Sequence, residues 1–198
     1  MAKNTQPVLK RCRTLGVSPA AMGYSKNSNR NPGGKRRTKK SEYAMQLTEK
    51  QKVKFVYGIL EKQFHILYEK AERMNGNTGE LLLSLVERRL DNVVYRLGFA
   101  RTRREARQLV NHGHFTVNGK RVNIPSYQTV VGDVIAVSEK SCATTRFKAM
   151  KEDNTFVAAP KWLERDKNTL SGKVIALPAR DDIDFEIAEN LIVELYSK

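Results

Sequence analysis

The sequence predicts an α+β protein in which a helical domain is joined to a module of two short helices and a small, mostly antiparallel sheet. Apolar residues recur at three- to four-residue spacing from Thr48 onward, which is the period of an amphipathic helix. Capping signals at Asp91 and Thr102 then mark two short helices, and Asn118-Gly119 separates two alternating segments, as in a β-hairpin. Residues 1–45 lack a helical stripe and are rich in Gly, Pro, Ser and Asn, so we expect a basic, extended arm there.

The helical domain is expected over residues 46–90. Thr48 starts a capping box, and the apolar stripe after it predicts one long helix, bent at Gly58. A shorter helix is expected to begin at Thr78, and a C-terminal helix over residues 190–198 should complete the domain. Four apolar side chains are expected to be buried: Val56, Leu60, Leu85 and Ile192.

The second domain is expected over residues 91–180. Asp91 is expected to cap its first helix, and Thr102 with Glu105 forms a capping box for the next one. Asn118-Gly119 suits a type I′ turn, which needs positive φ at both central residues. Further strands are expected around residues 134–137, 162–163 and 174–177.

The net charge of +15 points to a polyanionic partner. Residues 1–50 carry 12 basic and 2 acidic side chains and residues 88–150 carry 12 and 4, whereas residues 51–87 carry 5 of each. Two basic blocks separated by a neutral one favour nucleic acid over a uniform solubilising coat. The apolar runs are far shorter than the roughly 20 residues that cross a bilayer, neither block shows a basic amphipathic helix, and no signal peptide is recognisable. A cytoplasmic protein without a membrane partner is expected, with Cys12 and Cys142 as free thiols.

The candidate RNA contacts gather at two places. Arginines surround the start of the helix that Thr102 caps, where unpaired backbone N–H groups and the helix dipole favour a phosphate. A second run, after Pro32, places five positive charges in six residues. The alternative for each single arginine is a solvated side chain balanced by Glu105. The full candidate set is Lys35, Arg36, Arg37, Lys39, Lys40, Arg101, Thr102, Arg103, Arg104, Arg107, Gln108, His112, Asn118, Lys120 and Arg121.

The segment from Leu90 to Ser126 resembles the RNA-binding module named after small-subunit ribosomal protein S-four. Three flanking segments resemble the bacterial ribosomal family itself, so the resemblance covers essentially the whole chain: 51–64, 76–80 and 191–198. The family has a form with a four-cysteine zinc site in the N-terminal arm, but residues 1–45 contain only Cys12. We therefore expect the form without zinc, with no metal and no cofactor.

The resemblance implies a structural component of the small ribosomal subunit, located in the cytoplasm. Such a protein is a primary binder of small-subunit ribosomal RNA that nucleates assembly of the subunit body. The resemblance also implies ribosomal protein S-five as a neighbour and a place near the channel by which messenger RNA enters, with an influence on translational accuracy. By that resemblance, Arg36, Arg37 and Lys39 correspond to residues that grip and unwind incoming messenger RNA.

Two other classes of function remain as alternatives. Pseudouridine synthases carry similar modules and a catalytic Asp after Arg-Leu, and this chain has Arg89-Leu90-Asp91, but here the Asp precedes the module and a helix cap accounts for it. No enzymatic activity is therefore expected. A standalone RNA-binding translational repressor would use the same module, yet it would need neither the basic arm nor the motif at residues 191–198.

Overall fold

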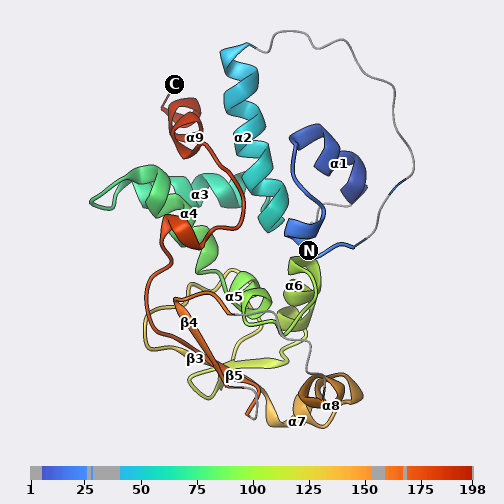
Figure 1. Cartoon of the computed structure of the whole chain (residues 1–198). Coiled ribbons are helices and arrows are strands. Elements are labelled where there is room, and N and C mark those ends of the chain that lie inside the picture. Colours follow the sequence, from blue (N-terminus) through green and yellow to red (C-terminus); the bar gives the residue numbers. More distant parts are fainter. Residues whose placement is uncertain (1–5, 26–27, 29–40, 153–158, 167–168, 198) are drawn as a thin grey trace. The chain divides into compact units, whose positions relative to one another are not determined.

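The computed structural model describes residues 6–25, 28, 41–152, 159–166 and 169–197 (Figure 1). The chain divides into two compact units, one formed by the described residues up to Leu83 together with those from Ile183 onward, and the other running from Ser84 to Asp182. The first unit is helical and the second combines helices with a sheet, which confirms the α+β class.

The helices of the first unit begin near the N-terminus and end with the last helix of the chain. They are α1 (Val8–Leu15), the short 3₁₀ helix η1 (Ala20–Met22), α2 (Glu42–Tyr57), α3 (Glu61–Glu72) and α9 (Glu189–Tyr196), and α4 (Thr78–Glu87) runs from this unit into the next. The predicted start of α4 at Thr78 is confirmed.

The start of α2 differs from the sequence expectation. The helix begins six residues earlier than Thr48, because the Ser41 hydroxyl accepts a hydrogen bond from the Ala44 N–H at 3.3 Å and caps it. Thr48 instead lies inside the helix, where its hydroxyl donates to the Ala44 carbonyl at 2.6 Å. A Thr in the interior of a helix can therefore imitate the sequence signature of a cap.

The expected single bent helix is in fact two helices, separated at Gly58. Gly58 adopts a left-handed conformation (φ +65°) and ends α2, and α3 starts at Glu61 after a short extended link. Because Leu60 lies in that link and not on a helical stripe, it is exposed, and its predicted burial is wrong. Val56, Leu85 and Ile192 are buried as expected.

The N-terminal segment also forms more structure than we expected from its composition. Residues 6–25 form α1 and η1, and Cys12, Leu15, Val17 and Met22 are all buried there. The expectation of an extended arm with little core is therefore wrong for this part. The small apolar set between Cys12 and Met22 is too irregularly spaced to be recognised as one helical stripe.

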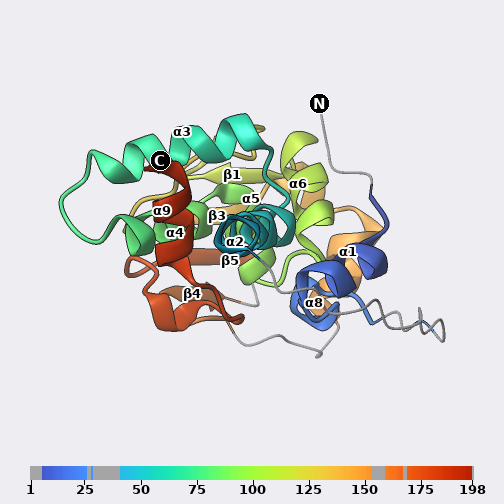
Figure 2. The ribbon, with the colours of Figure 1, turned by 90° about the horizontal axis from the view of Figure 1, so that it is seen from above.

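The last helix of the chain, α9, packs against α2, which is seen end-on in Figure 2. Tyr196 at its end donates its hydroxyl to Glu61 Oε1 at 2.8 Å, and its ring lies 4.6 Å from that of Tyr68. Lys50 lies 5.0 Å from the centre of the Tyr196 ring. These contacts attach the C-terminus to α2 and α3.

The second unit contains four helices and a five-stranded sheet among its described residues. The helices are α5 (Leu90–Arg96), α6 (Arg103–Asn111), α7 (Glu139–Cys142) and α8 (Thr145–Glu152), and the chain also forms the short 3₁₀ helix η2 (Arg180–Asp182). The strands are β1 (Phe115–Val117), β2 (Lys120–Arg121), β3 (Val134–Val137), β4 (Leu163–Asp166) and β5 (Ser171–Val174). Their order is β2-β1-β3-β5-β4, and every neighbouring pair is antiparallel.

The predicted hairpin at Asn118-Gly119 is confirmed. Both residues have positive φ, +50° and +77°, as a two-residue type I′ turn requires, and Val117 pairs with Lys120 across it. The strand expected around residues 174–177 lies earlier in the sequence. It is β5, which ends at Val174, and Ile175 follows it.

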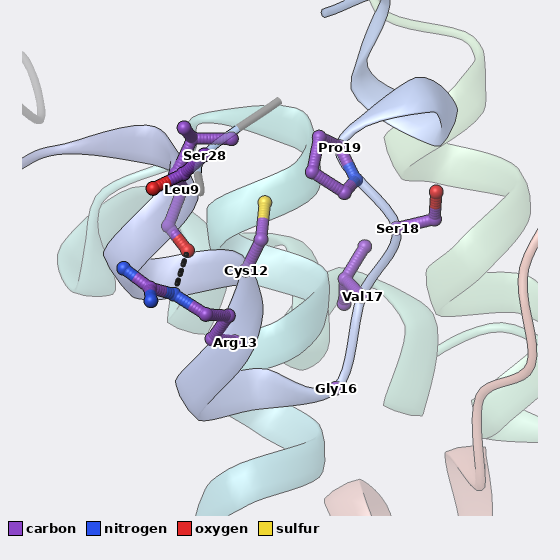
Figure 3. A pocket seen from close by; sticks show the side chains of 8 residues that line it. All are labelled: Leu9, Cys12, Arg13, Gly16, Val17, Ser18, Pro19 and Ser28. Carbon is purple, nitrogen blue, oxygen red and sulfur yellow. Dashed lines mark hydrogen bonds between the residues drawn. The ribbon is translucent and has the colours of Figure 1, made fainter. Parts of the chain in front are cut away.

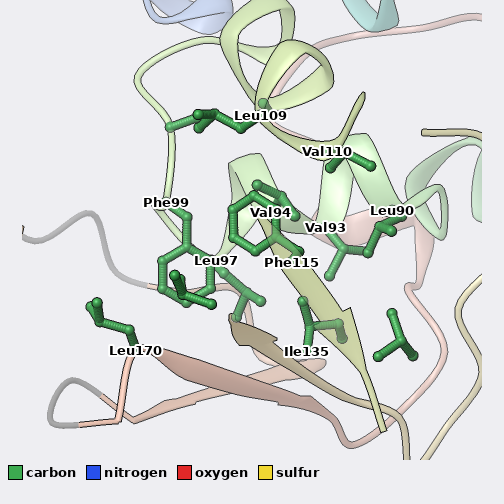
Figure 4. Close-up of a cluster of buried hydrophobic side chains, with 14 of the residues drawn as sticks. Leu90, Val93, Val94, Leu97, Phe99, Leu109, Val110, Phe115, Ile135 and Leu170 are labelled. Carbon is green, nitrogen blue, oxygen red and sulfur yellow. The ribbon is translucent and has the colours of Figure 1, made fainter. Parts of the chain in front are cut away.

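The core of the second unit lies between α5, α6 and the sheet (Figure 4). Val93 and Val94 of α5 and Leu97, which directly follows this helix, point toward Phe99 and Phe115, whose ring centres lie 5.8 Å apart. Ile135 of β3 is fully buried beside them. Burying these side chains fixes how α5 and α6 are held on the sheet. The outward surface of α6 is therefore displayed on a rigid support.

Candidate RNA-binding surface

The start of α6 is organised by a capping arrangement of Thr102 and Glu105. The Thr102 hydroxyl accepts from the Glu105 N–H at 3.2 Å, which confirms the predicted cap. The Glu105 carboxylate in turn accepts from the Arg101 N–H at 2.6 Å, one residue earlier than a standard capping box. The Thr102 side chain, proposed as an RNA contact, thus serves the helix start.

Arg103 and Arg107 lie on the inner face of α6, toward α5. The Arg103 guanidinium is buried, donates from Nε to Asn92 Oδ1 at 2.8 Å and stacks 4.4 Å from the Tyr95 ring centre. Arg107 donates from Nε to Asp91 Oδ2 at 2.7 Å. Their RNA contact stays a prediction, whereas their structural contacts within the unit are evident.

Asp91 does not cap α5 as we expected. Arg89 occupies the cap position, and Asp91 lies in the first turn with its buried carboxylate between Arg89 and Arg107. Nearby, fully buried Glu87 accepts from Arg96 Nη2 at 2.8 Å. A buried charge without an oppositely charged partner strongly lowers the stability of the fold, so each charged group in such a network needs its partner. The arginine-rich sequence therefore encodes an internal ionic network as well as a surface.

The remaining candidates on α6 and the hairpin form an exposed set. Arg104 and Gln108 lie one turn apart on the outer face of α6, and His112 follows at the next turn. Arg101 is exposed just before the helix and Lys120 just after the hairpin turn. We call this set the outer basic face, and it consists of Arg101, Arg104, Gln108, His112 and Lys120.

Two hairpin candidates also have contacts within the fold. Asn118 donates from Nδ2 to Asp133 Oδ1 at 2.8 Å and accepts from the Val134 N–H at 2.9 Å, so its side chain ties the hairpin to β3. Arg121 donates to the carbonyls of Gly113 and His112, at 3.0 and 3.1 Å. Arg121 thereby places its positive charge at the C-terminal end of α6 while its side chain remains exposed.

His114 lies near several basic side chains at this end of α6. Partial burial lowers the pKa of His114, and the nearby charges of His112, Arg146 and Arg121 lower it further. Its Nδ1 lies 2.9 Å from the Ser141 hydroxyl. Basic side chains gathered in this way favour an anionic partner.

The run from Lys35 to Lys40 lies outside the described residues, so its five candidates have no geometry here: Lys35, Arg36, Arg37, Lys39 and Lys40. Within the part of the chain that the structure describes, no helix is long and apolar enough to cross a membrane. The same residues contain no group of three or more His, Cys, Asp or Glu placed to hold a metal ion.

The first unit contains a pocket of about 340 Å³ beside α1 (Figure 3). Cys12 lies on its wall, and Arg13 donates from Nε to the Leu9 carbonyl at 3.3 Å. Burial raises the pKa of the Cys12 thiol, and its sulfur lies 3.8 Å from that of Met22. A protonated, buried thiol is an unreactive structural residue.

Sequence reasoning missed the acidic partners inside the module and the basic residue on α8. Glu87 and Asp91 were not recognised as ionic partners: Asp91 pairs with Arg89 and Arg107, and Glu87 pairs with Arg96, nine residues further along the chain. Arg146 was also missed, and its Nη2 lies 2.6 Å from Glu105 Oε1. The pairing of residues 41 positions apart leaves no signal in local spacing.

Comparison with known families assigns a class to each part of the chain. Residues 88–135 match the family described as "S4 domain", and residues 3–87 match "Ribosomal protein S4/S9 N-terminal domain". Together, the two matches define the class of protein: an N-terminal domain of the ribosomal S4/S9 type followed in the sequence by an S4 domain.

Curated relatives give the particular family. A protein of Fusobacterium nucleatum subsp. nucleatum named "Small ribosomal subunit protein uS4" is 53% identical over 198 residues, covering all of both chains. Relatives of the same name from Lachnospira eligens and Caldicellulosiruptor bescii are 54% identical over 198 residues (all of both chains) and 64% identical over 165 residues (83% of this chain and 79% of the relative). The chain belongs to the bacterial uS4 family, which confirms the resemblance seen in its sequence.

Proposed function

We propose that the protein is a non-enzymatic, structural component of the small ribosomal subunit in the bacterial cytoplasm and binds small-subunit ribosomal RNA. The observation that supports this most strongly is full-length similarity to proteins named for that subunit. The outer basic face supplies the chemistry, because exposed cations on a rigid helix and hairpin suit the RNA backbone. We assign it the primary-binder role that nucleates assembly of the subunit body.

The test is binding of the full chain to small-subunit ribosomal RNA, with large-subunit ribosomal RNA as the control. We expect preferential binding to the small-subunit RNA, weakened roughly 10³-fold between 50 and 200 mM salt if about six phosphates are contacted. Equal affinity for both RNAs would contradict a primary binder. A protein pool that never co-sediments with small subunits in a cell extract would favour the repressor alternative.

The contact with ribosomal protein S-five is a finer part of the proposal and is supported by the family resemblance. We expect chemical cross-links between the two proteins in purified small subunits. Subunits that yield cross-links to other proteins but none to S-five would contradict this neighbour.

The basic run after Pro32 is the proposed contact with messenger RNA near its entrance channel, with an effect on translational accuracy. Its support is the charge of the run and the family resemblance. Replacing Arg36, Arg37 and Lys39 with Ala should leave subunit assembly intact and slow translation of structured messenger more than of unstructured messenger. Equal rates on both templates, with assembly normal, would reduce the run to a general RNA contact.

A further inference from the structure

The first turn of α6 carries an acidic residue within the basic surface that is proposed to bind RNA. Glu105 lies within the basic segment, and its carboxylate is fixed beside the Arg101 N–H at the helix start. Burial alone would raise the pKa of Glu105, but hydrogen bonds from Arg146 and from the Arg101 N–H lower it, so the carboxylate is charged at neutral pH. An uncompensated negative charge at this position would repel RNA.

Arg146 of α8 supplies the compensating charge. Its Nη2 lies 2.6 Å from Glu105 Oε1, and the two side chains are 40% and 30% exposed. The helix that carries it is anchored through Phe147, which is fully buried and packs against the rings of His114 and Phe115. Arg146 is thus held beside α6 by the core of the same unit.

We propose that Arg146 is a positioning residue of the RNA-binding surface, which neutralises Glu105 and thereby keeps the outer basic face positive around Arg101 and Arg104. This inference rests on the proposed RNA-binding function and extends it beyond residues 88–135, the span of the matched S4 domain. The RNA-binding unit then includes α8, which lies after that span in the sequence. The lowered pKa of His114, to which Arg146 contributes after burial and His112, agrees with a positive charge at this place.

The geometry gives Arg146 an indirect role, which a double-mutant cycle distinguishes from direct RNA contact. Arg146→Gln removes the compensating charge and should weaken binding of small-subunit ribosomal RNA about 5-fold or more at low salt. Glu105→Gln keeps an acceptor for the Arg101 N–H and should bind as tightly as the native chain or more tightly. In the double variant both charges of the pair are absent, so the affinity should return to within about 2-fold of that of the native chain.

Lys148→Gln is the matched control, because it removes one positive charge from the exposed surface of the same helix. It should bind within about twofold of the native chain, and Arg146→Lys, which keeps the charge, should restore most of the affinity. Partly exposed ion pairs contribute little to stability, so all variants should remain folded in circular dichroism and thermal unfolding.

Three results decide the matter. An unchanged affinity of Arg146→Gln would overturn the inference, and so would a double variant that still bound several-fold more weakly than the native chain, since Arg146 would then contact RNA itself. If the native chain failed to prefer small-subunit ribosomal RNA, the proposed function would fall instead, and that outcome is read from the native protein before any variant is measured.

Discussion

At the scale of single residues, the arginines of α6 divide into an inner and an outer set. Arg103 and Arg107 face α5 and have partners inside the unit, whereas Arg104 points outward. Spacing along the sequence places Arg103 and Arg107 on one face of the helix, but it does not reveal that this face is turned toward Asp91 and Asn92. Only the packing of α5 on α6 decides which arginine is available to RNA.

Loss of a partner in the internal ionic network should therefore affect folding. Glu87→Gln leaves the buried Arg96 guanidinium without its carboxylate and should lower the free energy of unfolding by about 3–5 kcal/mol. Arg104→Gln, on the exposed face of α6, should change it by less than about 0.5 kcal/mol. Urea denaturation of both variants makes the comparison, and equal stabilities would contradict a structural role for the network.

Gly172 of β5 is required by close packing against Leu97, the residue that follows α5. A Cβ at this position would lie 2.4 Å from Leu97 Cδ2 and 3.1 Å from the Glu164 carbonyl oxygen, and Leu97 is fully buried. Gly172→Ala should thus lower the free energy of unfolding by about 1–3 kcal/mol through overpacking. The control is Lys173→Ala, at the neighbouring exposed residue, and both variants are compared by thermal unfolding. A larger loss of stability in Lys173→Ala than in Gly172→Ala would argue against this close contact.

At the scale of elements, the sequence predicts those whose signals are local and fails where tertiary contacts decide. The Asn118-Gly119 hairpin and the Thr102 cap are confirmed, because turn type and cap need only neighbouring residues. The start of α2 at Glu42 and its end before Gly58 were missed, since the apolar period continues through Leu60. The outer basic face follows partly from sequence, whereas Arg146 needed the fold.

A second network of charged and polar side chains lies where α2, α3 and α9 meet, and Glu61 is at its centre. Burial alone would raise the pKa of Glu61, but hydrogen bonds from Lys54, Lys50 and Tyr196 lower it to about 2. A depressed folded-state pKa contributes stability that is present above the unfolded-state value, near 4.5, and is lost as the pH falls toward 2.

Glu61→Gln should remove this pH dependence. The native chain should lose thermal stability between pH 6 and pH 3, and the variant, less stable at pH 6, should lose less over the same interval. Helical circular dichroism at both pH values measures the difference. Parallel losses in the two proteins would show that Glu61 does not contribute to acid sensitivity.

At the scale of the whole molecule, the positive charge lies in two blocks, residues 1–50 and 88–150, separated by a neutral one. The second unit presents the outer basic face, while residues 51–87 carry equal numbers of basic and acidic side chains. The two compact units divide between Leu83 and Ser84, close to the boundary between the two matched family domains. Full-length similarity to uS4 proteins then connects this distribution of charge with ribosomal RNA.

The most direct test of this account is the salt dependence of ribosomal RNA affinity when three exposed cations are removed. Arg101, Arg104 and Lys120 are replaced together by Gln, and the matched control replaces Lys62, Lys70 and Arg73, three exposed cations of the first unit, at the same change in net charge. The slope of log affinity against log salt should become shallower by about three for the first variant and stay near that of the native chain for the second. Slopes that remain equal in all three proteins would contradict the assignment of the outer basic face to RNA.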